Sequence, residues 1–250
     1  MKINKGQFIS RVDIGKVRLV NEDRAISIVN PNGDVLLAVC DGLGGHNKGD
    51  YASQLAINIL CDEFRNKTKF YGSISIRFFL SRVLKAMNRE VFSTAEKNAI
   101  YQDMGSTIVL ALLHNNKVYI AYAGDSRAYG LKDGVFTQLT EDQTLVDYYY
   151  KTGQMNKDEM SISSDRHKLM NAVGIYPTIS YSLHILKNEF DSILLCSDGL
   201  YNNMNDREMS DILKTNERLE QKVDTLIAVA NSNGGSDNMA ISLWERIKND

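Results

Sequence analysis

Three pairs of apolar segments, each pair joined by a short turn sequence, constrain the fold of this chain more than any other feature. Asn32-Gly33 separates AISIVN from DVLLAVC, Asn115-Asn116 separates TIVLALLH from KVYIAYAG, and Asp133-Gly134 separates SRAYGL from VFTQL. Glycine, asparagine and aspartate tolerate the positive φ angles that tight hairpin turns require. The pattern therefore predicts three β-hairpins and, with them, antiparallel sheets.

Other segments have helical spacing of their apolar residues. Stripes at i, i+3, i+4 and i+7 occur at Leu55–Phe64 and Ile76–Val91, and a helical pair is expected at about Asp206 to Lys214 and Arg218 to Asn231. Helices with one apolar face need a sheet to cover. We therefore predict an α+β protein in which two antiparallel sheets pack together with helices outside.

Length and charge limit the function classes. The 250 residues suit a single domain over 1–250 and can bury a large core. With 29 basic and 31 acidic residues the chain lacks the basic excess of a general nucleic-acid or membrane-surface binder. No apolar run is long enough to span a bilayer. We expect neither nucleic acid nor membrane as a partner.

The N-terminal 20 residues lack the apolar region and cleavage site of a signal peptide. The three cysteines, Cys40, Cys61 and Cys196, are an odd number, and two of them lie in or beside apolar runs. They are expected to be reduced and mostly buried. Both observations favour a cytoplasmic location.

The stretch from Thr144 to Met170 is polar and amphipathic, and Gly153 interrupts two short helical patterns within it. It is longer than an ordinary connection between strands. We expect a flap subdomain at about 144–170, with a solvated helical excursion as the alternative.

Acidic residues stand where apolar strands end or begin. Asp41 follows VLLAVC, Asp125 follows YIAYAG, and Asp198 follows SILLCS; Asp237 precedes the last apolar strand, and Glu22 and Asp23 sit together after Arg18 in GKVRLVNED. One aspartate at a strand end is an ordinary turn residue. Several at one rim would repel by about 4 kcal/mol per pair at ~4 Å, so protonation or bound cations would be needed.

The ligand types select among cations. Carboxylates with a backbone carbonyl suit Mg²⁺ or Mn²⁺, whereas the histidines and cysteines lack the spacing of a zinc site. Two such ions can activate a water, and Arg18, four residues before Glu22, is the candidate clamp for a phosphate. The pattern indicates hydrolysis of a phosphate ester. An ordinary surface role for Arg18 remains the alternative.

Other catalytic motifs were sought in the sequence. No cysteine has an arginine six positions later, so a cysteine phosphatase is excluded. GLGGHNKG lacks P-loop spacing, and no GxSxG motif occurs. The glycines of DGLGG alone indicate a tight turn.

Seven motifs in order carry a resemblance that covers about Arg11 to Leu243. They are GKVRLVNED, VCDGLGGH, GST at Gly105 to Thr107, AGDSRAY, LTEDQT, CSDGLYN and GGSDNMA. Together they resemble the metal-dependent protein serine/threonine phosphatases of type 2C, in their compact bacterial form. The resemblance implies a four-layer αββα sandwich and hydrolysis of phosphoserine and phosphothreonine in proteins with two Mn²⁺ or Mg²⁺ ions and a third, more labile one.

The resemblance also assigns roles by motif position. It makes Asp41 the carboxylate that bridges both metals, the Gly42 carbonyl a ligand of one, and Asp198 with Asp237 the ligands of the other. Asp125, with Asp198, would hold the third ion. Glu22 and Asp23 fall at an acidic ligand or water-ordering pair, and Arg18 matches the phosphate-binding arginine. Asn238 would fix its loop by hydrogen bonds, and the Thr144–Met170 stretch would select substrates.

Two positions depart from the family pattern. Leu43 stands where many eukaryotic members have histidine, so the general acid is unassigned. The nearby His46 is a candidate for catalysis and substrate binding, with a plain polar loop residue as its alternative. Gln143 replaces a frequent histidine in LTEDQT, which bears on packing near the flap.

The leading hypothesis is an active phosphatase that reverses a cytosolic serine/threonine kinase, with that kinase and its substrates as partners. The kinase follows from the family's logic and not from any residue. Two alternatives stay open: a catalytically silent sensor or regulatory module on the same fold, and a phosphatase of small metabolites.

Overall fold

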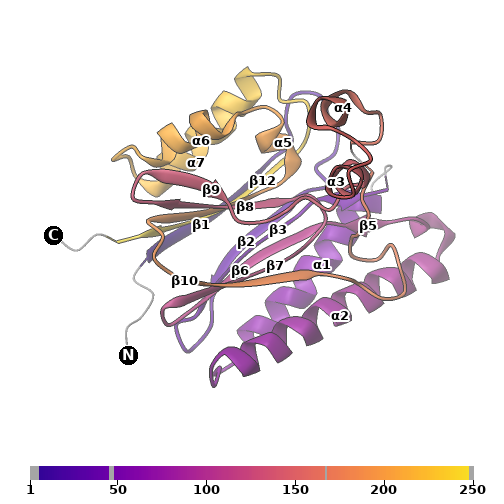
Figure 1. The fold of residues 1–250 in the computed structure, drawn as a ribbon. Helices are drawn as coiled ribbons and strands as arrows, with labels where there is room; N and C mark the ends of the chain where they lie inside the picture. The colour runs from indigo at the N-terminus through magenta and orange to yellow at the C-terminus, as the bar shows by residue number, and fades with distance from the viewer. Residues whose placement is uncertain (1–5, 45–47, 167, 248–250) are drawn as a thin grey trace.

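Two five-stranded antiparallel sheets lie face to face in the computed structural model, which describes residues 6–44, 48–166 and 168–247 (Figure 1). The first sheet has the order β1 (Gly6–Asp13), β12 (Met239–Arg246), β11 (Ser192–Cys196), β8 (Arg127–Lys132) and β9 (Val135–Gln138). The second has the order β10 (Ser182–Lys187), β7 (Lys117–Ala123), β6 (Ile108–His114), β3 (Val35–Cys40) and β2 (Arg24–Val29). The short strands β4 (Gly42–Leu43) and β5 (Gly105–Ser106) pair separately.

Helices cover the outer face of each sheet (Figure 1). On the second sheet lie α1 (Lys48–Arg65) and α2 (Ser73–Lys97), followed by the 3₁₀ turn η1 (Ala99–Tyr101). On the first lie α5 (Asp198–Tyr201), α6 (Asp206–Leu213) and α7 (Leu219–Ser232). Two short helices, α3 (Leu145–Lys151) and α4 (Lys157–Ile162), stand at one end of the sandwich (Figure 1).

Alternation along the central strands explains the four layers. In β3, Leu36, Ala38 and Cys40 face the core under α1 and α2, whereas Val35, Leu37 and Val39 face the core between the sheets. Strand β12 divides in the same way between the inter-sheet core and the core under α6 and α7. A strand buried on both faces reads as a continuous apolar run because both alternating sets must be apolar.

The three expected hairpins are confirmed as β2–β3, β6–β7 and β8–β9. Their turns contain the positive φ angles that the turn residues favour: 82° at Gly33, 53° at Asn115, and 50° and 77° at Asp133 and Gly134. The expected helices are confirmed as α1, α2, α6 and α7, and α1 begins earlier than its apolar stripe.

The analysis of the sequence did not anticipate β1, β10, α5 or the β4–β5 pair. Strands β1 and β10 are sheet edges whose residues are mostly half-buried, so they lack a strong apolar run. The three cysteines are free and buried, as expected. None of the helices in the described ranges combines the length and apolar character needed to cross a lipid bilayer.

Candidate active site

Strand direction brings four of the predicted acidic residues to one edge of the second sheet. Strands β3 and β7 both run antiparallel to β6, which lies between them, so their carboxyl ends share an edge. Asp41 follows β3 and Asp125 follows β7 by one residue. Strand β2 begins beside the end of β3, where Arg24 pairs with Cys40, and this places Glu22 and Asp23 at the same edge.

The first sheet contributes the other two positions by the same geometry. Cys196, the last residue of β11, pairs with Ile241 near the start of β12. Asp198, the first residue of α5, and Asp237, just before β12, therefore lie on neighbouring strand ends. We call the six residues from both sheets the acid cluster: Glu22, Asp23, Asp41, Asp125, Asp198 and Asp237.

The acid cluster is electrostatically costly. Burial, followed by the charge of Asp23, Asp198, Asp125 and Asp237, raises the pKa of Asp41 well above its ordinary value. Burial raises the pKa of Asp23 to about 7, with Asp198 and Asp237 adding to the shift and a hydrogen bond from Ser197 opposing it. Carboxylates from both sheets therefore contribute to the raised pKa values of Asp23 and Asp41.

Local partners hold the acid cluster in place. Ser197 Oγ donates to Asp23 Oδ2, and Asn202 Nδ2 donates to Asp198 Oδ2 over 3.1 Å. Arg18 Nη2 donates to Asp237 Oδ2 over 2.7 Å. Among the described residues, no three His, Cys, Asp or Glu side chains have their donor atoms placed to hold one ion. The carboxylates lie at one edge of the two sheets, but their oxygens are not arranged as a complete set of ligands around one ion.

Uncharged groups fix the loop that carries Glu22 and Asp23. Ser53 Oγ donates to the Glu22 carbonyl over 2.6 Å, and the Glu22 amide donates to Asn238 Oδ1 over 2.9 Å. Asn238 Nδ2 donates in turn to the Ile14 carbonyl over 2.9 Å. Asn238 therefore ties loops of the two sheets together, as expected. The Glu22 carboxylate accepts from the Gly49 amide at the start of α1.

The peptide after Asp41 requires glycine because other backbone lies against it. A Cβ on Gly42 would lie 2.2 Å from the Gly49 carbonyl oxygen and 2.6 Å from that of Glu22. On the other side, the Asp41 amide donates to Thr107 Oγ1 over 3.0 Å, and the Thr107 amide donates to the Asp41 carbonyl over 2.8 Å. The GST motif thus holds the end of β3 from the neighbouring strand.

A second set of residues, which was not predicted from the sequence, supports Asp125. Arg127 forms a forked pair with Asp142, with Nη2 2.6 Å from Oδ2, and its guanidinium lies 3.6 Å over the ring of Tyr201. Tyr201 Oη donates to the Asp125 carbonyl over 3.2 Å. The arginine of GDSR, the acid of LTEDQT and the tyrosine of CSDGLYN were all in quoted motifs, but no local pattern connected them.

The two departures from the family pattern, Leu43 and Gln143, have different surroundings. Leu43 is the second residue of β4 and pairs with Gly105, whereas the nearby His46 lies outside the described residues. Gln143 takes a structural place beside the flap: its Oε1 accepts from the Gly124 amide over 3.1 Å and from Asn171 Nδ2 over 2.9 Å. Its Nε2 donates to Ser182 Oγ over 3.2 Å. An amide can both accept and donate, so Gln143 links β7, β10 and the chain that leaves the flap.

The comparisons with known proteins decide the family. Residues 16–243 match the protein phosphatase 2C family. The chain belongs to that family. It is a serine/threonine protein phosphatase, and both the expected family and the expected enzyme class are confirmed.

Relatives and solved structures agree along nearly the whole chain. The phosphatase is 35% identical over 237 residues to the serine/threonine phosphatase stp of Listeria monocytogenes, with 94% of each chain covered. It superposes on the S. agalactiae serine/threonine phosphatase with a TM-score of 0.92, at 26% identity, covering 97% and 100% of the two chains. It also superposes on the catalytic domain of PstP in complex with two manganese ions with a TM-score of 0.83, at 28% identity, covering 97% and 99%. The expected layered α+β fold is confirmed.

The donor set of the phosphatase fits hard divalent cations. The rim presents six carboxylates and the Gly42 carbonyl, all of them oxygen donors. The nearby thiols of Cys40 and Cys196 are fully buried, and burial raises the pKa of each. Burial, followed by the charge of neighbouring acids, raises the pKa values of Asp23, Asp41 and Asp125, and bound divalent cations would favour the ionised form of all three.

Proposed function

We propose that this phosphatase removes phosphate from phosphoserine and phosphothreonine side chains of proteins, using Mn²⁺ or Mg²⁺ held by the acid cluster. The observation that carries the proposal is the convergence of six carboxylates, from strand ends of both sheets, at a rim that also carries Arg18. A site with this charge needs cations, and cations with an arginine suit a phosphate group.

Residues are assigned to the ions by donor type and by position in the motifs. Asp41 and the Gly42 carbonyl lie at the end of β3, close enough to the acids of both sheets for their charges to act on Asp41. We assign Asp41 as the residue that would hold two ions together. Asp198 and Asp237 serve the second ion, with Glu22 and Asp23 as ligands or as acceptors for ordered water. Asp125, with Asp198, serves a third. When bound, the ions would supply Lewis acidity and would lower the pKa of nearby water.

Arg18 is proposed to bind the phosphate group of the substrate. Its side chain is 51% exposed, and among the described residues its one hydrogen bond goes to Asp237. That hydrogen bond, opposed by burial and aided by the charges of Asp237, Asp198 and Glu22, raises the pKa of Arg18. The guanidinium is therefore held at the rim with further N–H donors for phosphate oxygens.

The flap is proposed to select substrates. Its two ends are joined, because the Leu145 amide donates to the Lys168 carbonyl and the Met170 amide donates to the Gln143 carbonyl, each over 2.8 Å. Between them, α3 carries the half-exposed rings of Tyr148 and Tyr150. A helical loop closed at its base can vary in sequence without disturbing the sheets. We treat the rest of residues 1–250 as one catalytic domain around this flap.

The partners and the location are further parts of the proposal. An enzyme that hydrolyses phosphoprotein esters needs a kinase that forms them, so we propose a serine/threonine kinase and its substrates as partners. The buried free thiols Cys40, Cys61 and Cys196 suit a reducing compartment, and we propose the cytoplasm.

The test is turnover of a phosphothreonine peptide against added Mn²⁺, with and without chelator. We expect turnover that needs the ion and is lost in Asp41→Asn, while the exposed turn variant Asp133→Asn retains it. Faster turnover of a sugar phosphate than of the peptide would favour the metabolite alternative. Ion binding without turnover of any phosphoester would favour the silent regulatory module.

His46 needs its own measurement. If it donates a proton to the leaving alkoxide, His46→Ala will lower the acid-side limb of the pH–rate profile. An unchanged profile and unchanged peptide preference would return His46 to its alternative, a polar loop residue.

A further inference from the structure

Basic residues are concentrated in one segment of this nearly neutral chain. Residues 64–89 contain seven of the 29 basic residues and no Asp or Glu. These seven are Arg65, Lys67, Lys69, Arg77, Arg82, Lys85 and Arg89. The whole-chain charge of −2 argued against a membrane-surface protein, but a net charge does not reveal a local concentration of basic residues such as this one. The segment runs from the end of α1 through most of α2.

Large apolar side chains project into solvent within the same segment. Tyr71 is 81% exposed, and Ile74 and Phe78 are each 74% exposed. From Ile74, steps of four, four, three and four residues lead through Phe78, Arg82 and Lys85 to Arg89. Residues at these intervals share one face of a helix. The opposite face of α2 is buried in the core. Its core residues are Ile76, Leu80, Val83, Leu84 and Met87.

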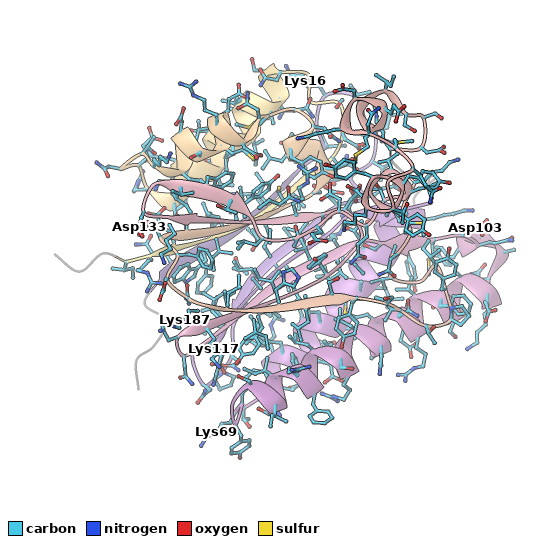
Figure 2. All side chains as sticks on the ribbon, in the orientation of Figure 1. Lys16, Lys69, Asp103, Lys117, Asp133 and Lys187 are labelled. Carbon is cyan, nitrogen blue, oxygen red and sulfur yellow. The ribbon has the colours of Figure 1, made fainter. Side chains whose placement is uncertain are left out.

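Lysines from neighbouring elements extend this face at the amino end of α2. Lys69 Nζ lies 5.2 Å over the ring of Tyr71, and Lys117 Nζ donates to Ser73 Oγ over 3.2 Å. Lys187 is paired with Lys117 across the edge of the sheet. Figure 2 shows Lys69, Lys117 and Lys187 along the same side of the molecule. Two lysines directly opposite each other repel and so destabilise the strand pair, and an anionic partner here would reduce that repulsion.

Few acidic groups balance these charges. Arg82 is paired with Glu63, and Arg89 lies beside Glu90. In the described ranges, neither Arg77 nor Lys85 has an acidic partner. The α2 outer face, defined as Tyr71, Ile74, Phe78, Arg77, Lys85 and the lysines 69, 117 and 187, is thus apolar at its centre and basic around it.

We propose that the α2 outer face binds the surface of an anionic phospholipid bilayer. Such a surface attracts basic side chains electrostatically and accepts projecting aromatic and aliphatic side chains between its headgroups. It needs no cavity on the protein, and the three apolar side chains project from a helix instead of lining one. The cavities of about 390 and 570 Å³ are lined by other residues.

Binding in this way leaves the acid cluster accessible. The cluster lies at the carboxyl ends of β3 and β7, whereas Lys117 at the start of β7 and Lys187 at the end of antiparallel β10 lie at the opposite end of those strands. The α2 residues of the face lie on the side of that helix opposite its core-packed residues, away from the second sheet (Figure 1). Attachment would therefore concentrate the phosphatase near phosphoproteins at a membrane without covering the site. The proposal concerns where the protein acts, so it stands or falls independently of the proposed function.

Sedimentation with vesicles tests the proposal. The full chain should bind phosphatidylcholine vesicles that contain phosphatidylglycerol, and binding should weaken with salt and without phosphatidylglycerol. Arg77→Gln with Lys85→Gln should reduce the partition coefficient by roughly 30-fold, from about 1 kcal/mol for each charge. Arg207→Gln with Lys214→Gln, on exposed positions of the α6 side, makes the same charge change and should have little effect.

A second pair of substitutions separates lipid from an acidic protein surface. Ile74→Ser with Phe78→Ser should weaken vesicle binding at least about tenfold, because it removes the apolar groups that enter the bilayer. Turnover of a soluble phosphopeptide should stay within about twofold of wild type in every variant, which shows that each is folded. The proposal is overturned by absent binding to anionic vesicles, by equal loss in the α6-side control, or by vesicle binding that ignores the Ile74 and Phe78 changes. The last result would indicate an acidic protein surface instead.

Discussion

Replacing Asp125 by asparagine should stabilise the metal-free protein at alkaline pH. Asp125 is buried after β7, and burial, followed by the charges of Asp198 and Asp142, raises its pKa from 3.8 to about 7. The folded state therefore holds the proton more tightly than the unfolded chain does. For an acid shifted in this direction, stability is highest below the unfolded pKa and is lost as the pH rises toward the folded pKa.

The size of the effect follows from the shift. About three pKa units at 1.36 kcal/mol per unit give roughly 4 kcal/mol of destabilisation by the Asp125 carboxylate once the pH exceeds 7. At pH 5 the folded state still holds the proton while most unfolded chains have lost it, and the cost is about 2 kcal/mol. Asparagine has nearly the same shape and no charge, so Asp125→Asn should recover most of this cost.

Urea unfolding in chelator measures the prediction. The midpoint of Asp125→Asn should exceed that of wild type at pH 8, and the difference should shrink at pH 5. Asp133→Asn is the matched control, because Asp133 is an exposed turn residue with φ of 50°, which asparagine accepts. The control should shift stability by no more than about 0.5 kcal/mol.

Addition of Mn²⁺ should reverse the order of stability. An ion that binds only the folded state stabilises it by RT ln(1 + [ion]/Kd), so tighter binding stabilises more, and wild type keeps the carboxylate that the variant lacks. The melting temperature of wild type should therefore rise more than that of Asp125→Asn. A variant that is less stable than wild type at pH 8 in chelator would refute the argument, since it would mean that the carboxylate stabilises the ion-free fold.

Three further predictions test the rim and its supports. Arg18→Ala should raise the KM for a phosphopeptide about tenfold or more, with a smaller change in kcat, because it removes charged hydrogen bonds to phosphate. Gly42→Ala should lower the urea midpoint and abolish turnover, since its Cβ would lie 2.2 Å from the Gly49 carbonyl oxygen. Arg127→Gln breaks the forked pair with Asp142 and should weaken Mn²⁺ activation about 10- to 100-fold in a metal titration, while circular dichroism shows an unchanged fold.

Local chemistry explains why much of the fold was predictable. Asn32-Gly33 and Asp133-Gly134 favour positive φ by themselves, and one strand of each hairpin, β3 or β8, places residues in two apolar cores. The signal for each hairpin therefore lies within about fifteen residues. Edge strand β10 carries no such signal, because its outer side faces solvent and its residues are only half-buried. Its place beside β7 depends on pairing between residues that are distant in the sequence, from Ser182 with Tyr122 to Lys187 with Lys117.

The same distinction applies to the site. An acid at the end or start of a strand could be recognised because the adjacent run of apolar residues marks where that strand ends or begins. The supports could not be recognised, because Ser53 reaches Glu22 from α1 and Ser197 reaches Asp23 from the other sheet. Sequence separation of this kind leaves no periodic pattern, and a serine beside a strand end is chemically unremarkable until its partner is known.

Most anchors that touch the acid cluster directly are uncharged, and this bears on why the rim stays reactive. Ser53, Thr107, Ser197 and Asn238 hold the loops through hydroxyl or amide groups. These neutral groups bond the backbone beside the acids, or in the case of Ser197 the Asp23 carboxylate, without cancelling negative charge. A positive partner at the open side of the cluster is Arg18, which is half-exposed and paired at one Asp237 oxygen. A buried cation in that place would satisfy the acids permanently and compete with a divalent ion, whereas an exposed arginine can exchange its partner for phosphate. The instability expected of the ion-free rim is therefore a consequence of the same arrangement that lets it bind ions and substrate.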